Sequence, residues 1–226
     1  MTSEVRDWLH RLRKDDRDIA RLVGQAIQAL VEEGPGLGRP LVDRIKGAEV
    51  HNLKELRPGL AGASEVRMLF AFDPRRNAVR LVAGDKAGQW SGWYRWAIPA
   101  AEARCAEWLD HLARTAGGGR GVTGLHAWDD VKHEVFDAED LDAIDAGAQR
   151  MVAEARARRL AEMRRQLGLT QREVAARMHV RQERVSAIER GNAAAAEVRT
   201  IAAYIAALGG QLEIVANFND TRVTVA

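Results

Sequence analysis

A pair of short, capped helices near the end of the chain is the sequence feature that most constrains how it folds. Residues 157–191 read ARRLAEMRRQLGLTQREVAARMHVRQERVSAIERG. Thr170 and Glu173 have the spacing of a capping box, in which each side chain bonds the backbone amide of the other residue. Such a helix pair can place its second helix in the major groove of DNA. Apolar residues at helical spacing predict the shared core: Leu160, Met163, Leu167, Val174, Ala175, Met178, Val185 and Ile188.

The polar residues around the second helix have side chains suited to reading DNA. Gln182 can bond the edge of adenine through two atoms, and Arg181 or Arg184 can do the same with guanine. The alternative interpretation is that they are solvated residues of a helical bundle that binds no DNA. The side chains better suited to phosphate oxygens are Gln171, Arg172, Arg177 and Arg190.

Residues 156–226 resemble the Cro/repressor-type (XRE) helix-turn-helix. Among its members they are most similar to HigA-type antitoxins, because EVRTIAAYIAALGGQLEIVANF matches their final helix and hairpin. His179 stands where the family usually has Gly, and Arg181 replaces the usual Ser or Thr cap of the recognition helix. Alternating apolar residues over 211–218, a turn and the strand 222–225 independently predict a terminal β-hairpin. The resemblance implies DNA contacts from Gln171, Arg181, Gln182, Arg184 and Ser186.

The glycine-rich segment AGGGRG at 116–121 predicts a linker, because such a segment disfavours both helix and strand. Before it, the apolar spacing predicts a helix over 17–33, strands over 41–45, 50–56, 66–72 and 78–84, and a helix that begins at Pro99. The predicted fold is therefore α+β: an N-terminal helix–antiparallel sheet–helix domain joined to an all-α helix-turn-helix domain. The predicted divisions are a domain at 1–115, the linker, a connector helix at 122–155 and the helix-turn-helix with its hairpin at 156–226.

The first domain carries a second resemblance, on ELR, VRMLFAFDP, LVAGDKAG, GWY and IP, which occur in that order over 41–112. It is similar to the HigB-like branch of the RelE/ParE toxin superfamily, which implies a small α+β fold and endoribonuclease activity on ribosome-associated mRNA. No metal ion is required if Lys and Arg side chains supply the positive charge. RNA cleavage by 2′-hydroxyl attack requires an acid, a base and cations beside the phosphate. Arg57, Arg67 and Lys86 are the candidate cations, and Tyr94 is a candidate acid.

Aromatic residues in the first domain admit two interpretations. Trp90 and Trp93 are candidates for stacking on single-stranded RNA bases, whereas aromatic runs also form protein cores. Arg57, Arg67 and Lys86 are equally open to being ordinary exposed sheet residues. His51 is the nearest histidine candidate for catalysis, although the sequence gives it no defensible catalytic position.

Charge along the chain is uneven. Residues 121–155 hold 2 Lys+Arg and 9 Asp+Glu, a net charge of −7, whereas residues 1–120 are net +4 and residues 156–226 are net +5. One hypothesis is that the acidic connector covers the basic face of the first domain and occupies its RNA site. The other is that it is an ordinary surface helix.

The remaining features bound the function classes. Cys105 is the single cysteine, so we expect no disulfide, no metal site and no cofactor. No apolar run suggests a membrane span, and the expected location is the cytoplasm. The expected partners are operator DNA, mRNA or the ribosome, and a second copy through the C-terminal domain. Three functions stay open: a fused toxin–antitoxin autorepressor with a neutralised ribonuclease, a plain transcriptional regulator with an inactive first domain, and an active ribosome-dependent mRNA interferase.

Overall fold

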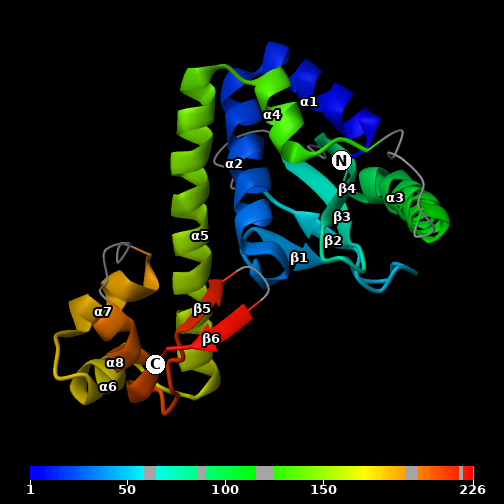
Figure 1. Ribbon diagram of the computed structural model, residues 1–226. Helices are drawn as coiled ribbons and strands as arrows, with labels where there is room; N and C mark the ends of the chain where they lie inside the picture. Colours follow the sequence, from blue (N-terminus) through cyan, green and yellow to red (C-terminus); the bar gives the residue numbers. More distant parts are fainter. Residues whose placement is uncertain (59–64, 86–89, 116–124, 192–197, 219–220, 226) are drawn as a thin grey trace. The chain divides into compact units, whose positions relative to one another are not determined.

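The computed structural model describes residues 1–58, 65–85, 90–115, 125–191, 198–218 and 221–225. It contains two compact units, Met1–Val152 and Ala153–Ala226, which are described separately below (Figure 1). The predicted linker at 116–121 falls outside the described residues. No helix within the described ranges is long and apolar enough to cross a membrane.

Two helices open the first unit. Helix α1 (Ser3–Asp15) is capped by the Thr2 hydroxyl, and its existence was not part of the sequence prediction. Helix α2 (Arg17–Glu33) has the predicted bounds, because Asp16 caps its first turn and Gly34, at φ 55°, ends it. The apolar stripe of α2 is buried from Ala20 to Leu30. A short 3-10 turn, η1 (Gly34–Gly36), follows.

A four-stranded antiparallel sheet forms the centre of the first unit, in the order β1 (Val42–Arg44), β2 (Lys54–Leu56), β3 (Val66–Phe72) and β4 (Ala78–Asp85). This confirms the predicted α+β fold and its antiparallel meander. Strand β2 is shorter than the predicted 50–56, because the amide of Leu53 bonds the carbonyl of Val50 and closes a turn there. The register places Leu56 opposite Met68 and continues into β4 with a bulge at Leu69 and Phe70.

Helix α3 (Trp90–Thr115) covers one face of this sheet, and α2 lies on the other side (Figure 1). The prediction that this helix begins at Pro99 is wrong, since Pro99 lies inside it. The buried stripe Trp93, Ala97, Ala101 and Cys105 has an unbroken spacing of four residues on both sides of the proline. Burying that stripe outweighs the hydrogen bond that the proline cannot donate.

The predicted connector forms two helices, α4 (Trp128–Val135) and α5 (Ala138–Gln166). They are separated at Phe136 and Asp137, where the Asp137 carboxylate accepts the amide of Asp140 at 3.0 Å and caps α5. The first half of α5 packs on α2 in the first unit. A Cβ placed on Gly24 would lie 2.7 Å from Ile144, so glycine permits this close crossing. The compact units divide within α5, at Val152 and Ala153.

The second unit comprises the end of α5, α6 (Gln171–Arg177), α7 (Gln182–Glu189), α8 (Val198–Ala207) and the hairpin β5 (Val215–Phe218) and β6 (Thr221–Thr224). The predicted terminal hairpin is thus confirmed. Tyr204 of α8 is fully buried among the side chains of α6 and α7 and completes their core. The core residues are Val174, Ala175, Val185, Ile188, Tyr204 and Ala207, with Leu160, Leu169, Met178, Ile201 and Leu208 packed around them.

Candidate functional site

The helix pair of the second unit has the local geometry that its sequence predicts. The Thr170 hydroxyl accepts the amide of Glu173 at 3.2 Å, and the Glu173 carboxylate accepts the Thr170 amide at 2.7 Å. His179 has φ 54°, the left-handed conformation expected at a position where glycine is usual. Arg181 is the N-cap of α7, and its side chain forms no cap bond. The Arg181 side chain is exposed.

A buried charge network fixes the position of α7. Arg164 on α5 donates to both carboxylate oxygens of Glu189, at 2.6 and 2.9 Å, with side-chain exposures of 9% and 4%. Tyr204 donates its hydroxyl to Glu189 at 2.7 Å. Burial alone would raise the pKa of Glu189, but the bonds from Arg164, Gln171 and Tyr204 lower it. The end of α7 is therefore held by a fully charged pair.

The network reaches the predicted DNA-reading residues through Gln171. Its amide nitrogen donates to Glu189 at 2.9 Å, and its amide oxygen accepts from Gln182 at 3.4 Å. Gln182 and Arg184 are exposed on α7. The buried pair thus orients Gln171 and, through it, the first residue of α7.

The other predicted DNA-binding residues differ in what their side chains contact. Arg172 is exposed. Arg190 is also exposed, and its Nη1 donates to the Ser186 hydroxyl at 2.5 Å. Arg177, predicted to suit phosphate, instead donates to the carbonyl of Ala207 at 2.8 Å and ties α6 to the end of α8. An exposed row of guanidinium and amide groups on a rigid helix can bond phosphates and base edges together.

The predicted catalytic residues of the first unit gather around a carboxylate that the sequence prediction missed. Glu55 of β2 is only 3% exposed. It accepts bonds from Arg57 Nε at 2.7 Å and from the Tyr94 hydroxyl at 2.5 Å, and Arg67 Nε lies 3.8 Å from its second oxygen. Asp43 of β1 lies 3.0 Å from Arg57 Nη2. Arg57, Arg67 and Tyr94 thus lie around one buried carboxylate.

Electrostatics define the protonation states in this cluster. Burial, followed by the bond to Glu55, raises the pKa of Tyr94 far above neutrality, so its phenol stays protonated. Burial opposes the charge of Arg57, but Glu55 and Asp43 raise its pKa. The Arg57 side chain is 37% exposed, whereas that of Arg67 is 12% exposed. The cluster therefore presents a proton donor and one accessible cation.

The other predicted residues of the first domain lie apart from this cluster or outside the description. Lys86 falls outside the described residues, as does the side chain of Trp90. Trp93 is 5% exposed, and a Cβ on Gly84 would lie 2.7 Å from its Nε1. Its indole belongs to the core, so Trp93 is not placed to stack on a base. His51 is exposed.

The acidic connector contacts a different surface from the one that the masking hypothesis required. Asp140, with a side chain of 0% exposure, lies 2.9 Å from Arg17 Nε and also bonds Arg13 and Arg21. Asp137 and Glu139 bond the same three arginines. Arg13 belongs to α1 and Arg17 and Arg21 belong to α2, whereas Glu55 lies on β2 and Tyr94 on α3. The hypothesis that the connector covers the site of Arg57 and Arg67 is therefore wrong.

The sequence carried one weak signal for Glu55 and none for the partners of Asp140. Glu55 stands between Lys54 and Leu56 in a predicted strand, where alternation assigns it to the same face as the buried Leu53. A carboxylate on a core-facing position indicates a specific partner. Within the described ranges, no group of three or more His, Cys, Asp or Glu residues is arranged to hold a metal ion.

The fold and these two sites define a chain that joins a toxin-like α+β unit to a helix-turn-helix unit. Residues 7–106 match the family described as phage-derived protein Gp49-like, and residues 160–215 match the family described as helix-turn-helix. The chain belongs to the HigB-type, Gp49-like toxin family in its N-terminal part and to the XRE helix-turn-helix family in its C-terminal part.

Relatives of both kinds occur in Mycobacterium tuberculosis. The chain is 54% identical over 107 residues to the candidate toxin HigB2 and 48% identical over 116 residues to the candidate toxin HigB3. The first match spans 47% of this chain and half of HigB2, and the second spans 51% of this chain and 94% of HigB3. The chain is also 46% identical over 85 residues to the candidate antitoxin HigA2, a match that spans 38% of this chain and 84% of HigA2. Toxin-like and antitoxin-like domains are thus fused in one chain.

Proposed function

We propose that this chain is an autoregulating toxin–antitoxin protein whose C-terminal unit represses transcription by binding operator DNA in a sequence-specific manner. The observation that carries this proposal is the exposed row of Arg181, Gln182 and Arg184 on a helix anchored by the Arg164–Glu189 pair. A recognition helix must be rigid for its base contacts to discriminate between sequences. Two copies on a palindromic operator would match the usual geometry of such readers.

The test is retention of DNA from upstream of the chain's own gene in a gel-shift assay. Gln182→Ala combined with Arg184→Ala should abolish specific retention, because each bidentate base contact is worth about 1–3 kcal/mol. Arg150→Ala is the matched control: Arg150 is exposed on α5 in the first unit and should not change retention. Circular dichroism verifies the fold of each variant. Retention of the double variant at the wild-type level would overturn the proposed readout.

We infer further that the first unit is a latent endoribonuclease. Its cluster provides Tyr94 as a proton donor and Arg57 and Arg67 as cations for the phosphate, with Glu55 as the residue that positions them. This set supplies the acid and the cations, two of the three requirements of metal-independent cleavage by 2′-hydroxyl attack. Glu55 also neutralises part of the positive charge of the cluster, which favours the second candidate, a plain regulator with an inactive first unit.

Cleavage of mRNA during cell-free translation distinguishes the candidates. The full chain is compared with residues 1–152, which keep the contacts of α4 and α5 with α1 and α2. If residues 1–152 cleave mRNA and the full chain does not, the C-terminal unit neutralises a nuclease. Tyr94→Phe or Arg67→Ala should then abolish the cleavage by residues 1–152. Equal cleavage by the full chain would identify an active ribosome-dependent interferase. Absence of cleavage from both would identify the plain regulator.

A further inference from the structure

A cavity of about 600 Å³ in the first unit is lined by residues that neither candidate site uses. It lies between β4, the end of α2 and the segment 125–130, which includes the start of α4. Its walls combine apolar side chains, among them Leu30, Phe72, Trp108 and Trp128, with the polar residues Arg76, Asn77, Arg80, His126, Asp129 and Asp130. Such a cavity is large enough for a small organic molecule.

Arg80 of β4 lines this cavity and is 5% exposed. Its Nε has no hydrogen-bond partner, and no carboxylate in the described part of the chain forms an ion pair with its guanidinium. Arg164, the other buried arginine within the described ranges, is paired with Glu189 at 2.6 Å. The buried Asp73 carboxylate in the preceding turn is engaged by Asn77, at 2.8 Å to its amide and 3.1 Å to its side chain. Burial lowers the pKa of Arg80 to about 10, so the group keeps its proton at neutral pH.

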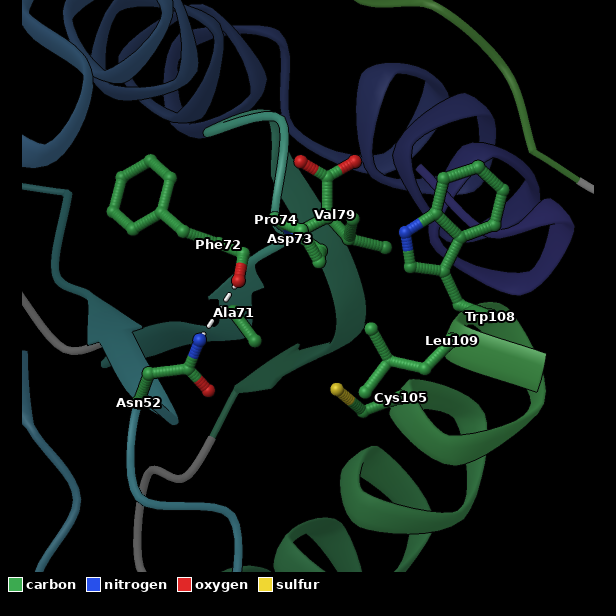
Figure 2. Close-up of a pocket in the computed structure, with 9 residues that line it drawn as sticks. All are labelled: Asn52, Ala71, Phe72, Asp73, Pro74, Val79, Cys105, Trp108 and Leu109. Atoms are coloured by element: carbon green, nitrogen blue, oxygen red, sulfur yellow. Dashed lines mark hydrogen bonds between the residues drawn. The ribbon is translucent and has the colours of Figure 1, made fainter. Parts of the chain in front are cut away.

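A second unsatisfied donor lines the same cavity. Trp108 Nε1 is buried without a hydrogen-bond partner among the described residues. Trp108 also lines a neighbouring cavity of about 320 Å³, where Figure 2 draws its indole beside Val79, Cys105 and Leu109. In that smaller cavity, Asn52 donates to the Phe72 carbonyl at 2.7 Å, which Figure 2 marks with a dashed line. Trp108 therefore lines both cavities, whereas Arg80 lines the larger of the two.

Buried polar groups in folded proteins are almost always hydrogen-bonded, and a buried charge without a partner is costly. A ligand that supplies an anionic acceptor to Arg80 and a second acceptor to Trp108 would remove that cost. The rim carries two exposed carboxylates, Asp129 and Asp130, of which Asp129 is paired with Lys132 at 2.9 Å. Asp129 and Asp130 offset the charges of Arg76 and Arg80 in the lining, which disfavours a dianion such as phosphate, and the apolar part of the walls favours a hydrophobic body.

We propose that this cavity is a binding site for a small organic monocarboxylate with an apolar, ring-sized body, held by Arg80 and Trp108. The carboxylate would accept from the Arg80 guanidinium and the Trp108 indole, while Leu30, Phe72 and Trp128 enclose the ring. The proposed site does not depend on the exposed row of Arg181, Gln182 and Arg184 or on the Glu55 cluster.

The test is the thermal unfolding midpoint of the full chain with added phenylacetate, compared with its neutral isostere phenylacetamide and with inorganic phosphate. A ligand that binds only the folded state raises the midpoint in proportion to RT ln(1 + [L]/Kd). Phenylacetate should raise it in a dose-dependent way, and the other two probes should not. Equal shifts from phenylacetate and phenylacetamide, a larger shift from phosphate, or no shift from any probe would each overturn the proposal.

Variants assign the effect to the cavity. Arg80→Met should weaken phenylacetate binding by about tenfold or more, the loss expected for a charged hydrogen bond, and should not lower the midpoint in the absence of ligand. Trp108→Phe should weaken binding by a smaller factor. Arg75→Met, at an exposed position in the adjacent turn, is the matched control and should bind like the wild type. If Arg80→Met fails to fold, the comparison of phenylacetate with its amide on the wild-type chain decides the outcome alone. Undiminished binding by a folded Arg80→Met variant would overturn the assignment.

Discussion

Asp140 accepts a hydrogen bond from Arg13 Nε at 2.9 Å, a contact between residues 127 positions apart in the chain. Asp140 is the buried centre of a cluster that also contains Arg17 and Arg21. The contact ties the start of α5 to α1 and α2, so the acidic segment is part of the first unit's structure.

Asp140→Asn should lower the free energy of unfolding of the first unit by about 2 kcal/mol, because charge-assisted bonds are lost while the arginines stay in place. Urea unfolding followed by tryptophan fluorescence measures this, since all six Trp residues precede residue 153. Asp142→Asn is the matched control, because Asp142 is exposed on the same helix. Equal stability of the two variants would show that the arginine cluster contributes little.

Acid should weaken the same contact in a defined pH window. Burial alone would raise the pKa of Asp140, but the bonds from Arg21, Arg17 and Arg13 lower it to about 2, from 3.8 for a free Asp. A carboxyl group with a lowered pKa contributes full stability above its unfolded pKa, and this is lost as the pH falls toward the folded pKa. The difference in unfolding midpoint between wild type and Asp140→Asn should therefore be constant above about pH 4 and shrink toward pH 2. A difference that does not change across this range would contradict the assignment.

Gly84→Ala should destabilise the first unit by about 1–3 kcal/mol through overpacking. The added Cβ would lie 2.7 Å from Trp93 Nε1, in the core between the sheet and α3, where the indole is too rigid to move aside. Gly38→Ala is the control, since a Cβ there meets nothing within 4 Å. Scanning calorimetry of both variants measures the effect, and an unchanged Gly84→Ala midpoint would indicate that the core relaxes around the added methyl group.

Glu189→Gln should impair both the stability and the DNA affinity of the second unit. It leaves the buried Arg164 guanidinium without its charge partner, at a cost of about 3 kcal/mol or more, and it replaces one of the two acceptor oxygens that Arg164, Tyr204 and Gln171 share with an amide donor. Operator retention at a temperature where the variant is folded separates the two effects. Glu183→Gln, at an exposed position on the same helix, should change neither. Operator affinity equal to the wild type would show that Gln171 is positioned without Glu189.

Local patterns predicted the elements whose ends are marked by local chemistry. Helix α2 begins at the Asp16 cap and ends at Gly34, and α6 begins at the Thr170 capping box, so nearest-neighbour bonds decide these bounds. Strand β3 was predicted with its observed bounds because its apolar residues are framed by turns. Helix α3 was predicted to begin too late, because Pro99 marks a local start that the apolar stripe facing the sheet overrides.

The candidate sites likewise combine features that local sequence decides with features that tertiary packing decides. The sequence alone determined the helix-turn-helix and its terminal hairpin, because capping, turn geometry and helical periodicity act over only a few residues. It also named Arg181, Gln182 and Arg184 as DNA contacts and Arg57, Arg67 and Tyr94 as catalytic residues, roles that stay predictions. Only the tertiary structure decided that Arg57, Arg67 and Tyr94 surround Glu55, that the acidic connector binds Arg13, Arg17 and Arg21, and that Arg80 Nε is buried without a hydrogen-bond partner in the part of the chain that the structure describes. Those outcomes depend on which side chains meet across the sheet and between distant helices, and a charge count or a local pattern carries no information about such pairings.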